Sequence, residues 1–197
     1  MNAGNSLSHV MFASSAREAK ANLSRIVTWL LHHEHRLFRW INQRLRHQAL
    51  DWFFNTVTHL GGASATIAIT LGLALLARGE WRTTAIQSLI ALAVSHLPVA
   101  VIKKKYPRLR PYLVLPHTIT GKNPLKDHSF PSGHTTAVFS VTVPFMLNMS
   151  PAFLFLLPLA CLVGMSRIYL GLHYPSDCLA GSLIGTVTAF AAVAFFG

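Results

Sequence analysis

Charged residues are scarce in this sequence. They make up 12% of its 197 residues, and Asp and Glu contribute only six of them, against 17 Lys and Arg. Hydrophobic residues account for 52%. Because about a quarter of the residues in ordinary soluble domains are charged, this composition excludes that class and predicts a protein embedded in a membrane.

Cysteine is scarce as well. The two cysteines, Cys161 and Cys178, lie in apolar stretches, and their spacing fits neither a CxxC metal site nor a disulfide framework. We therefore expect both to be small core residues.

Positive charge is concentrated in two blocks, with seven Lys and Arg in residues 17–46 and seven in residues 103–126. Both blocks adjoin apolar segments, so we expect lipid headgroups or phosphate-bearing substrates as their anionic partners, and no nucleic acid. Residues 23–45 place apolar side chains at three- to four-residue steps, opposite a face of Arg and His. This pattern predicts an amphipathic helix at the membrane interface, although packing on a partner protein would produce it too.

Apolar segments after Asp51 predict an all-α integral membrane bundle of about five transmembrane helices, preceded by the interfacial helix. The run from Gly133 to Met165 has no Asp, Glu, Lys or Arg and would form a helix about 50 Å long, against a hydrocarbon core of about 30 Å. It must therefore hold two helices, with a turn at "NMSP". The predicted spans are residues 52–77, with a kink or break at Gly61-Gly62, residues 83–102, two helices within residues 133–165, and residues 178–196.

The number of crossings places three polar regions on one face of the membrane. Two predicted spans separate the amino-terminal region from the loop at residues 103–129. Two more separate that loop from residues 166–177. One site can therefore be assembled from these regions.

Eight residues in or next to these polar regions are candidates for that site. The segment "KKKYPRLRP" supplies two cations, "PSGH" begins an apolar helix, and "SRIYLGLHYPSD" combines a cation, a histidine and a carboxylate. Each segment alone has an ordinary structural explanation, namely a charged helix flank, a capped helix, and a local His-Asp cap. The candidates are Lys103, Arg110, Ser132, Gly133, His134, Arg167, His173 and Asp177.

Together these residues suit phosphoryl transfer. A helix that begins after Ser132 and Gly133 presents free amides and a positive dipole end, where an oxyanion can bind beside His134. His173 and Asp177 are four residues apart, so the carboxylate can fix one ring nitrogen and leave the other as a base or nucleophile. The three cations would stabilise charge on the transferred phosphoryl group.

A metal site is the chemical rival, because His134, His173 and Asp177 are all metal-ligand types. The three candidate cations would repel a dication, and they already neutralise a phosphate. We therefore expect no metal ion and no other cofactor.

The ordered set resembles the three-part signature of the type 2 phosphatidic acid phosphatase (PAP2) superfamily. The matching parts are Lys103-x6-Arg110-Pro111, Pro131-Ser132-Gly133-His134, and Ser166-Arg167-x5-His173-x3-Asp177. The resemblance makes residues 50–197 the transmembrane catalytic domain, after a polar amino terminus and interfacial helix in residues 1–49. Two features depart from the family: membrane members commonly have six spans, and several bacterial undecaprenyl-pyrophosphate phosphatases have an aspartate at the position of Gly133.

The resemblance implies roles for the candidates. His173 would attack phosphorus and form a phosphohistidine, with Asp177 holding its reactive tautomer, while His134 would protonate the leaving oxygen and later activate water. The remaining residues would bind the phosphate oxygens without a metal ion; they are Lys103, Arg110, Ser132, Gly133 and Arg167. We expect Arg108, inside the first signature, to attract anionic lipid without touching the reacting phosphorus.

The function implied is hydrolysis of a lipid-linked phosphate or diphosphate in a bacterial plasma membrane, with undecaprenyl pyrophosphate as the favoured substrate. Phosphatidylglycerol phosphate and phosphatidic acid are alternatives. A non-catalytic polybasic scaffold that binds anionic lipids is an alternative of another class. The positive-inside rule favours a cytoplasmic site, whereas the resemblance to enzymes that recycle lipid carriers favours the outer face.

Overall fold

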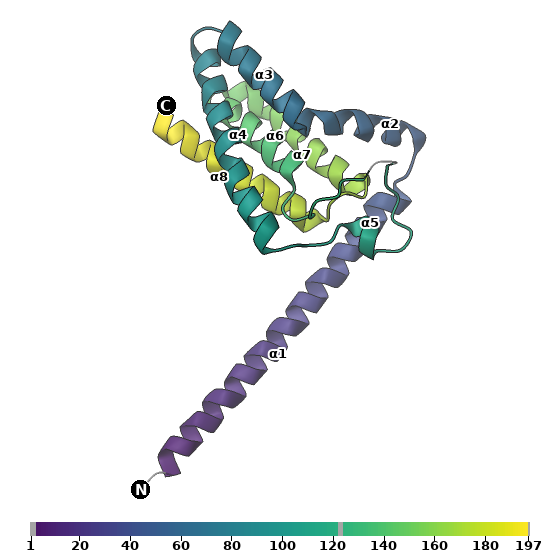
Figure 1. Ribbon diagram of the computed structural model, residues 1–197, viewed down its shortest axis with the longest axis vertical. Coiled ribbons are helices and arrows are strands. Elements are labelled where there is room, and N and C mark those ends of the chain that lie inside the picture. Colours follow the sequence, from purple (N-terminus) through teal and green to yellow (C-terminus); the bar gives the residue numbers. More distant parts are fainter. Residues whose placement is uncertain (1–2, 122–123, 197) are drawn as a thin grey trace. The chain divides into compact units, whose positions relative to one another are not determined.

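The computed structural model describes residues 3–121 and 124–196, and the regular elements within these ranges are all helices (Figure 1). The all-α prediction is confirmed. By its internal contacts the chain divides into two units, residues 1–37 and 38–197. The functional division between residues 49 and 50 stays a prediction.

The first unit is formed by most of one long helix, α1 (Ala3–Arg39). No Pro occurs in α1 and its only Gly lies at the second position, so no residue along its length favours a break. The amphipathic pattern that begins at residue 23 therefore lies on a helix, as expected. Its position at a membrane surface stays a prediction.

The second unit begins with the last residues of α1 and the π-helical turn η1 (Trp40–Arg44). Phe38 is fully buried and Ile41 is 3% exposed, and both belong to a hydrophobic cluster with Phe54, Tyr169 and Tyr174. The apolar stripe predicted from the sequence thus ends in the core of this unit.

The predicted break at Gly61-Gly62 is present. Helix α2 (Gln48–Val57) continues into the 3₁₀ turn η2 (Thr58–Gly61), and α3 (Ala63–Leu76) leaves at an angle of 54°. A Cβ atom on Gly61 would lie 2.5 Å from Cγ1 of Val163 and 3.0 Å from the carbonyl oxygen of His134. Glycine therefore lets this break pack directly against the helices that carry the site.

The remaining helices follow the predicted order. The turn predicted at "NMSP" separates α6 from α7, and the last helix begins at Pro175, three residues before the predicted start. Their bounds are α4 (Glu80–Lys105), α5 (Pro111–Val114), α6 (Gly133–Asn148), η3 (Ser150–Ala152), α7 (Phe153–Tyr169) and α8 (Pro175–Phe196).

Helix α6 lies at the centre of the second unit, packed against α4, α7 and α8 (Figure 1). Small residues allow the close approach of α8, because a Cβ on Gly185 would lie only 2.5 Å from the carbonyl oxygen of Thr136. The hydroxyls of Thr136 and Ser140 donate to the carbonyls of Ser132 and Thr136, each at 2.9 Å. These two hydroxyls are thereby satisfied by carbonyls of their own segment.

Among the described residues, three segments are long and apolar enough to cross a membrane, namely α4, α7 with the preceding η3, and α8. The bent pair α2–α3 makes a fourth if it counts as one span. Helix α6 has 16 residues, which gives a length of about 24 Å, less than a hydrocarbon core of about 30 Å. The integral membrane bundle is supported, and the count of five spans stays a prediction.

Candidate active site

A pocket of about 230 Å³ lies where the end of α4, the start of α6 and the turn between α7 and α8 meet. Of the eight predicted site residues, five line it: Lys103, Arg110, Gly133, His134 and His173. The other three are buried next to this lining: Ser132, Arg167 and Asp177. Residues from three separate segments of the sequence are thus brought together, and two of these segments are polar regions that the crossing argument placed on one face.

His173 lies in the turn between α7 and α8 and is only 2% exposed. Nη1 of Arg110 lies 3.3 Å from Nε2 of His173 and also donates to the carbonyl of Leu172 at 2.7 Å. An arginine has no acceptor, so Nε2 must accept, and the proton of neutral His173 is then on Nδ1. This tautomer leaves a lone pair on Nε2.

The Nδ1 atom of His173 lies 3.6 Å from Oδ2 of Asp177, and no hydrogen-bond partner for it is found among the described residues. This distance exceeds that of a hydrogen bond, so the contact is electrostatic. Burial is the main reason why the pKa of His173 falls to about 4, and Arg110 and Arg167 act in the same direction. The imidazole is therefore neutral at physiological pH.

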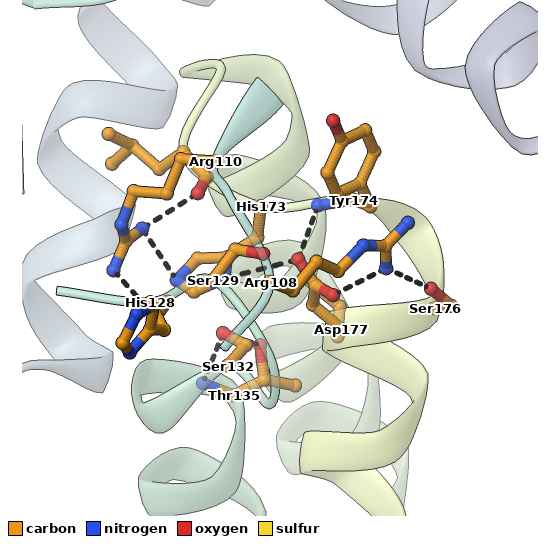
Figure 2. Close-up of polar contacts among 12 residues, drawn as sticks. Arg108, Arg110, His128, Ser129, Ser132, Thr135, His173, Tyr174, Ser176 and Asp177 are labelled. Atoms are coloured by element: carbon orange, nitrogen blue, oxygen red, sulfur yellow. Dashed lines mark hydrogen bonds and ion pairs between the residues drawn. The ribbon is translucent and has the colours of Figure 1, made fainter. Parts of the chain in front are cut away.

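Asp177 is held by a residue that sequence reasoning assigned elsewhere. Its Oδ2 accepts from the backbone amide of Tyr174 at 2.8 Å, and its Oδ1 accepts from Nη1 of Arg108 at 2.7 Å (Figure 2). The sequence predicted that Arg108 attracts anionic lipid, whereas the structure pairs its guanidinium with this buried carboxylate. The two residues are 69 positions apart, and no spacing in the sequence signals the pair.

Asp127 is a second residue that the sequence reasoning missed. Its Oδ1 accepts from Nη2 of Arg110 at 2.7 Å, and its Oδ2 pairs with the Lys103 ammonium group. Burial raises the pKa of Asp127, but the two cations outweigh this effect and lower it to about 2. One ionised carboxylate thus pairs with two of the three predicted phosphate-binding cations and offsets part of their charge.

The start of α6 has the predicted capping arrangement. Ser132 is the N-cap, and its hydroxyl oxygen accepts from the Thr135 amide at 3.4 Å. The Ser132 amide donates to the carbonyl of Asp177 at 3.0 Å, which ties this helix start to α8. A Cβ atom on Gly133 would meet nothing within 4 Å, so the pocket is open at this point. His134 follows directly and shares the pocket with His173.

Arg167 is 3% exposed, and its Nη1 donates to the hydroxyl of Thr58 at 2.6 Å. Its Nε is buried without a hydrogen-bond partner among the described residues. Its carbonyl accepts the His173 amide at 3.1 Å, so the cation is fixed next to the turn that carries His173. A buried guanidinium with an unused donor is suited to an anionic acceptor.

No group of three or more His, Cys, Asp or Glu side chains that could hold a metal ion is found in residues 3–121 and 124–196. The donors that converge on the pocket are cations, imidazoles and the amides at the start of α6. Groups of this kind can bind a phosphate, supply a nucleophile and transfer a proton.

A family model described as the PAP2 superfamily matches residues 84–197, which contain all eight predicted site residues. The chain belongs to the PAP2 superfamily. With its long apolar helices, this membership identifies an integral membrane protein. It confirms the resemblance seen in the three-part signature.

Relatives in this superfamily include two curated proteins. The bacitracin transport permease protein BcrC of Bacillus licheniformis is 34% identical over 109 residues, 55% of this chain and 53% of that protein. The undecaprenyl-diphosphatase of Sulfolobus acidocaldarius is 32% identical over 114 residues, 57% of this chain and 55% of that protein. This PAP2 chain therefore matches only about half the length of these relatives.

A solved PAP2-like structure covers more of the chain. The crystal structure of Aquifex aeolicus LpxE aligns with a TM-score of 0.72 and 28% sequence identity, covering 81% of this chain and 93% of that one. The fold of most of this chain is thus one already known from a solved protein.

Proposed function

We propose that this PAP2 protein is a metal-independent phosphatase that hydrolyses a lipid-linked phosphate or diphosphate. The observation that carries this proposal is the contact between Arg110 and Nε2 of His173 inside a pocket shared with His134. The contact fixes a lone pair on the nitrogen that must attack, next to the cations that must bind the phosphate. Membership of a superfamily with a relative called undecaprenyl-diphosphatase supports the same reaction class.

In the proposed first step, the Nε2 lone pair of His173 forms a bond to phosphorus while the bond from phosphorus to the leaving oxygen breaks. Negative charge on the bound phosphate favours the protonated form of His134, which gives its proton to that oxygen. Lys103, Arg110 and the amides at the start of α6 stabilise the charge on the phosphoryl oxygens. Arg110 must release Nε2 as the phosphate arrives, and the phosphate oxygens then become its acceptors.

In the second step, His134 accepts a proton from water as the water oxygen attacks phosphorus. The bond between phosphorus and Nε2 breaks, inorganic phosphate leaves, and His173 returns to its neutral form. Asp177 faces Nδ1 throughout and favours the tautomer that can attack again.

An apolar cavity supports a lipid as the carrier of the phosphate. It has a volume of about 340 Å³ and lies between α3, α6 and α7. Leu60 and Val138 line this cavity, and their sequence neighbours Gly61 and Ala137 line the polar pocket. A hydrocarbon tail in the cavity would leave the phosphate near His134. We favour undecaprenyl pyrophosphate as the substrate.

The decisive experiment measures phosphate release from purified protein in detergent with a chelator present. Undecaprenyl pyrophosphate, phosphatidylglycerol phosphate and phosphatidic acid are compared by kcat/KM, and we expect the first to be highest. His173→Ala should release no phosphate, and His32→Ala, in the first unit, should match the wild type. If the wild type binds these lipids and releases phosphate from none of them, the protein is a lipid-binding scaffold and the proposal fails.

A further inference from the structure

The carboxylate of Asp177 is shared between two positively polarised neighbours. It is fully buried, with one oxygen 2.7 Å from Nη1 of Arg108 and the other 3.6 Å from Nδ1 of His173 (Figure 2). The Tyr174 amide donates to the second oxygen at 2.8 Å, so neither oxygen is free to rotate away. The orientation of this carboxylate relative to the His173 ring therefore depends on Arg108.

Arg108 is itself fixed on the turn that carries the nucleophile. Its guanidinium carbon lies 3.9 Å from the centre of the Tyr174 ring, and its Nη1 also donates to the hydroxyl of Ser176 at 2.8 Å. Figure 2 shows the guanidinium end between Tyr174 and Ser176, pointing at Asp177. A planar guanidinium can stack and donate in this way, whereas an ammonium group cannot do both with the same geometry.

Arg108 does not line the pocket that holds His134 and His173. A residue outside the pocket cannot bind the phosphate directly, but it can act through the carboxylate that it holds. We propose that Arg108 is a positioning residue for the nucleophile, because it holds Asp177 in the orientation that presents Nε2 of His173 to phosphorus. This inference rests on the proposed function.

The charge of Arg108 also has a consequence for the protonation of His173. It offsets part of the negative charge of Asp177, so removing it exposes the imidazole to the whole carboxylate charge. The imidazolium form, which has no lone pair on Nε2, would then persist to higher pH. The other charged or titratable groups around His173 stay in place; they are Arg110 from the loop after α4, His134 on α6 and Arg167 on α7.

The test compares Arg108→Gln with Lys104→Gln, which removes the same charge from an exposed neighbour in the same segment. For Arg108→Gln we expect kcat to fall by about 10- to 100-fold, the usual cost of a lost orienting contact. KM and inhibition by inorganic phosphate should stay at wild-type values. In Arg108→Gln the acid limb of the pH profile of kcat/KM should move to higher pH. Arg108→Lys should recover part of kcat. Lys104→Gln should behave as the wild type.

Two results would overturn the inference. One is a wild-type kcat and pH profile in Arg108→Gln; the other is a loss of activity matched by a lower thermal transition with no shift in the pH profile. If the wild type proves inactive, the proposed function fails, and the inference is decided by ¹⁵N-histidine spectra. The His173 signal, assigned with His173→Ala, must then titrate at higher pH in Arg108→Gln than in the wild type, and equal titration refutes the role of Arg108.

Discussion

Asp127 and Arg110 form an ion pair at 2.7 Å inside the pocket, and the second oxygen of Asp127 pairs with Lys103. The same two cations are the ones that we expect to bind phosphate. A phosphate that enters the pocket must therefore compete with a carboxylate from the protein's own loop. Asp127 keeps the cations in place, and at the same time it weakens their attraction for an incoming anion.

Asp127→Asn should bind phosphate more tightly. The amide oxygen can still accept a hydrogen bond from Arg110, but the negative charge is gone. We expect the inhibition constant of inorganic phosphate to fall by about fivefold, because the Asp127 carboxylate is half exposed and ion pairs in contact with solvent are worth about 1 kcal/mol or less each. Glu80→Gln, which removes a negative charge at the start of α4, should leave the constant unchanged. A weaker affinity in Asp127→Asn would show that the carboxylate mainly orders the two cations.

Gly133→Asp tests the position at which several undecaprenyl-pyrophosphate phosphatases carry an acid. The structure has room for the side chain, because a Cβ there would meet nothing within 4 Å. The protein should fold normally, and the added charge should weaken phosphate inhibition by about tenfold, the effect of one like charge in a partly screened pocket. Gly133→Asn is the neutral control and should keep wild-type affinity. Poor folding of both variants would contradict the open geometry.

The helix order was predictable because apolar runs in this sequence are interrupted by residues with clear backbone preferences. Gly61-Gly62 marks the 54° break, and "NMSP" marks the turn between α6 and α7. The sequence also predicted that the site residues meet, from an even number of expected crossings between their segments, and five of them line one pocket. These inferences need only local chemistry and a count of spans.

The ion pairs of the site could not be predicted in this way. Arg108 reaches Asp177 across 69 positions, and Asp127 reaches Lys103 across 24, through a loop whose path no helical periodicity dictates. From the sequence alone, a charged residue near a cluster of cations is as compatible with a contact to lipid headgroups as with an ion pair inside the protein. Only the folded loop decides which carboxylate each cation meets.

Packing between α6 and α8 gives a prediction about stability. A Cβ on Gly185 would lie 2.5 Å from the Thr136 carbonyl oxygen and 2.8 Å from Cβ of Phe139, so Gly185→Ala must push the two helices apart. Such overpacking costs about 1–3 kcal/mol. We expect a lower thermal transition in detergent, followed by tryptophan fluorescence. Gly72→Ala, where nothing lies within 4 Å, is the matched control, and an equal loss in both variants would refute the close-packing explanation.

Replacing His173 should reduce activity more than replacing His134, the other histidine of the pocket. His173→Ala should abolish turnover and the formation of any acid-labile phosphoprotein, because no other group supplies the bond to phosphorus. His134→Ala should lose roughly 10²- to 10⁴-fold in kcat, the usual contribution of a general acid. Rapid quenching with a radiolabelled substrate measures both quantities. Covalent label retained in His173→Ala would assign the nucleophile to another residue.

The burial of His173 should disfavour the protonated form of its imidazole. Its pKa of about 4 lies below the value of about 6.5 for an exposed imidazole, so the folded protein keeps it neutral where an unfolded chain would protonate it. Folding stability from this group is therefore present above about pH 6.5 and is lost as the pH falls towards 4.

Because the phosphate of a substrate also titrates in this window, the direct measurement is the ¹⁵N shift of His173 in detergent. The signal should still be that of the neutral Nδ1–H tautomer at pH 5. An imidazolium signal at that pH would mean that Asp177, not burial, dominates the site, and that the nucleophile needs a proton removed before it can attack.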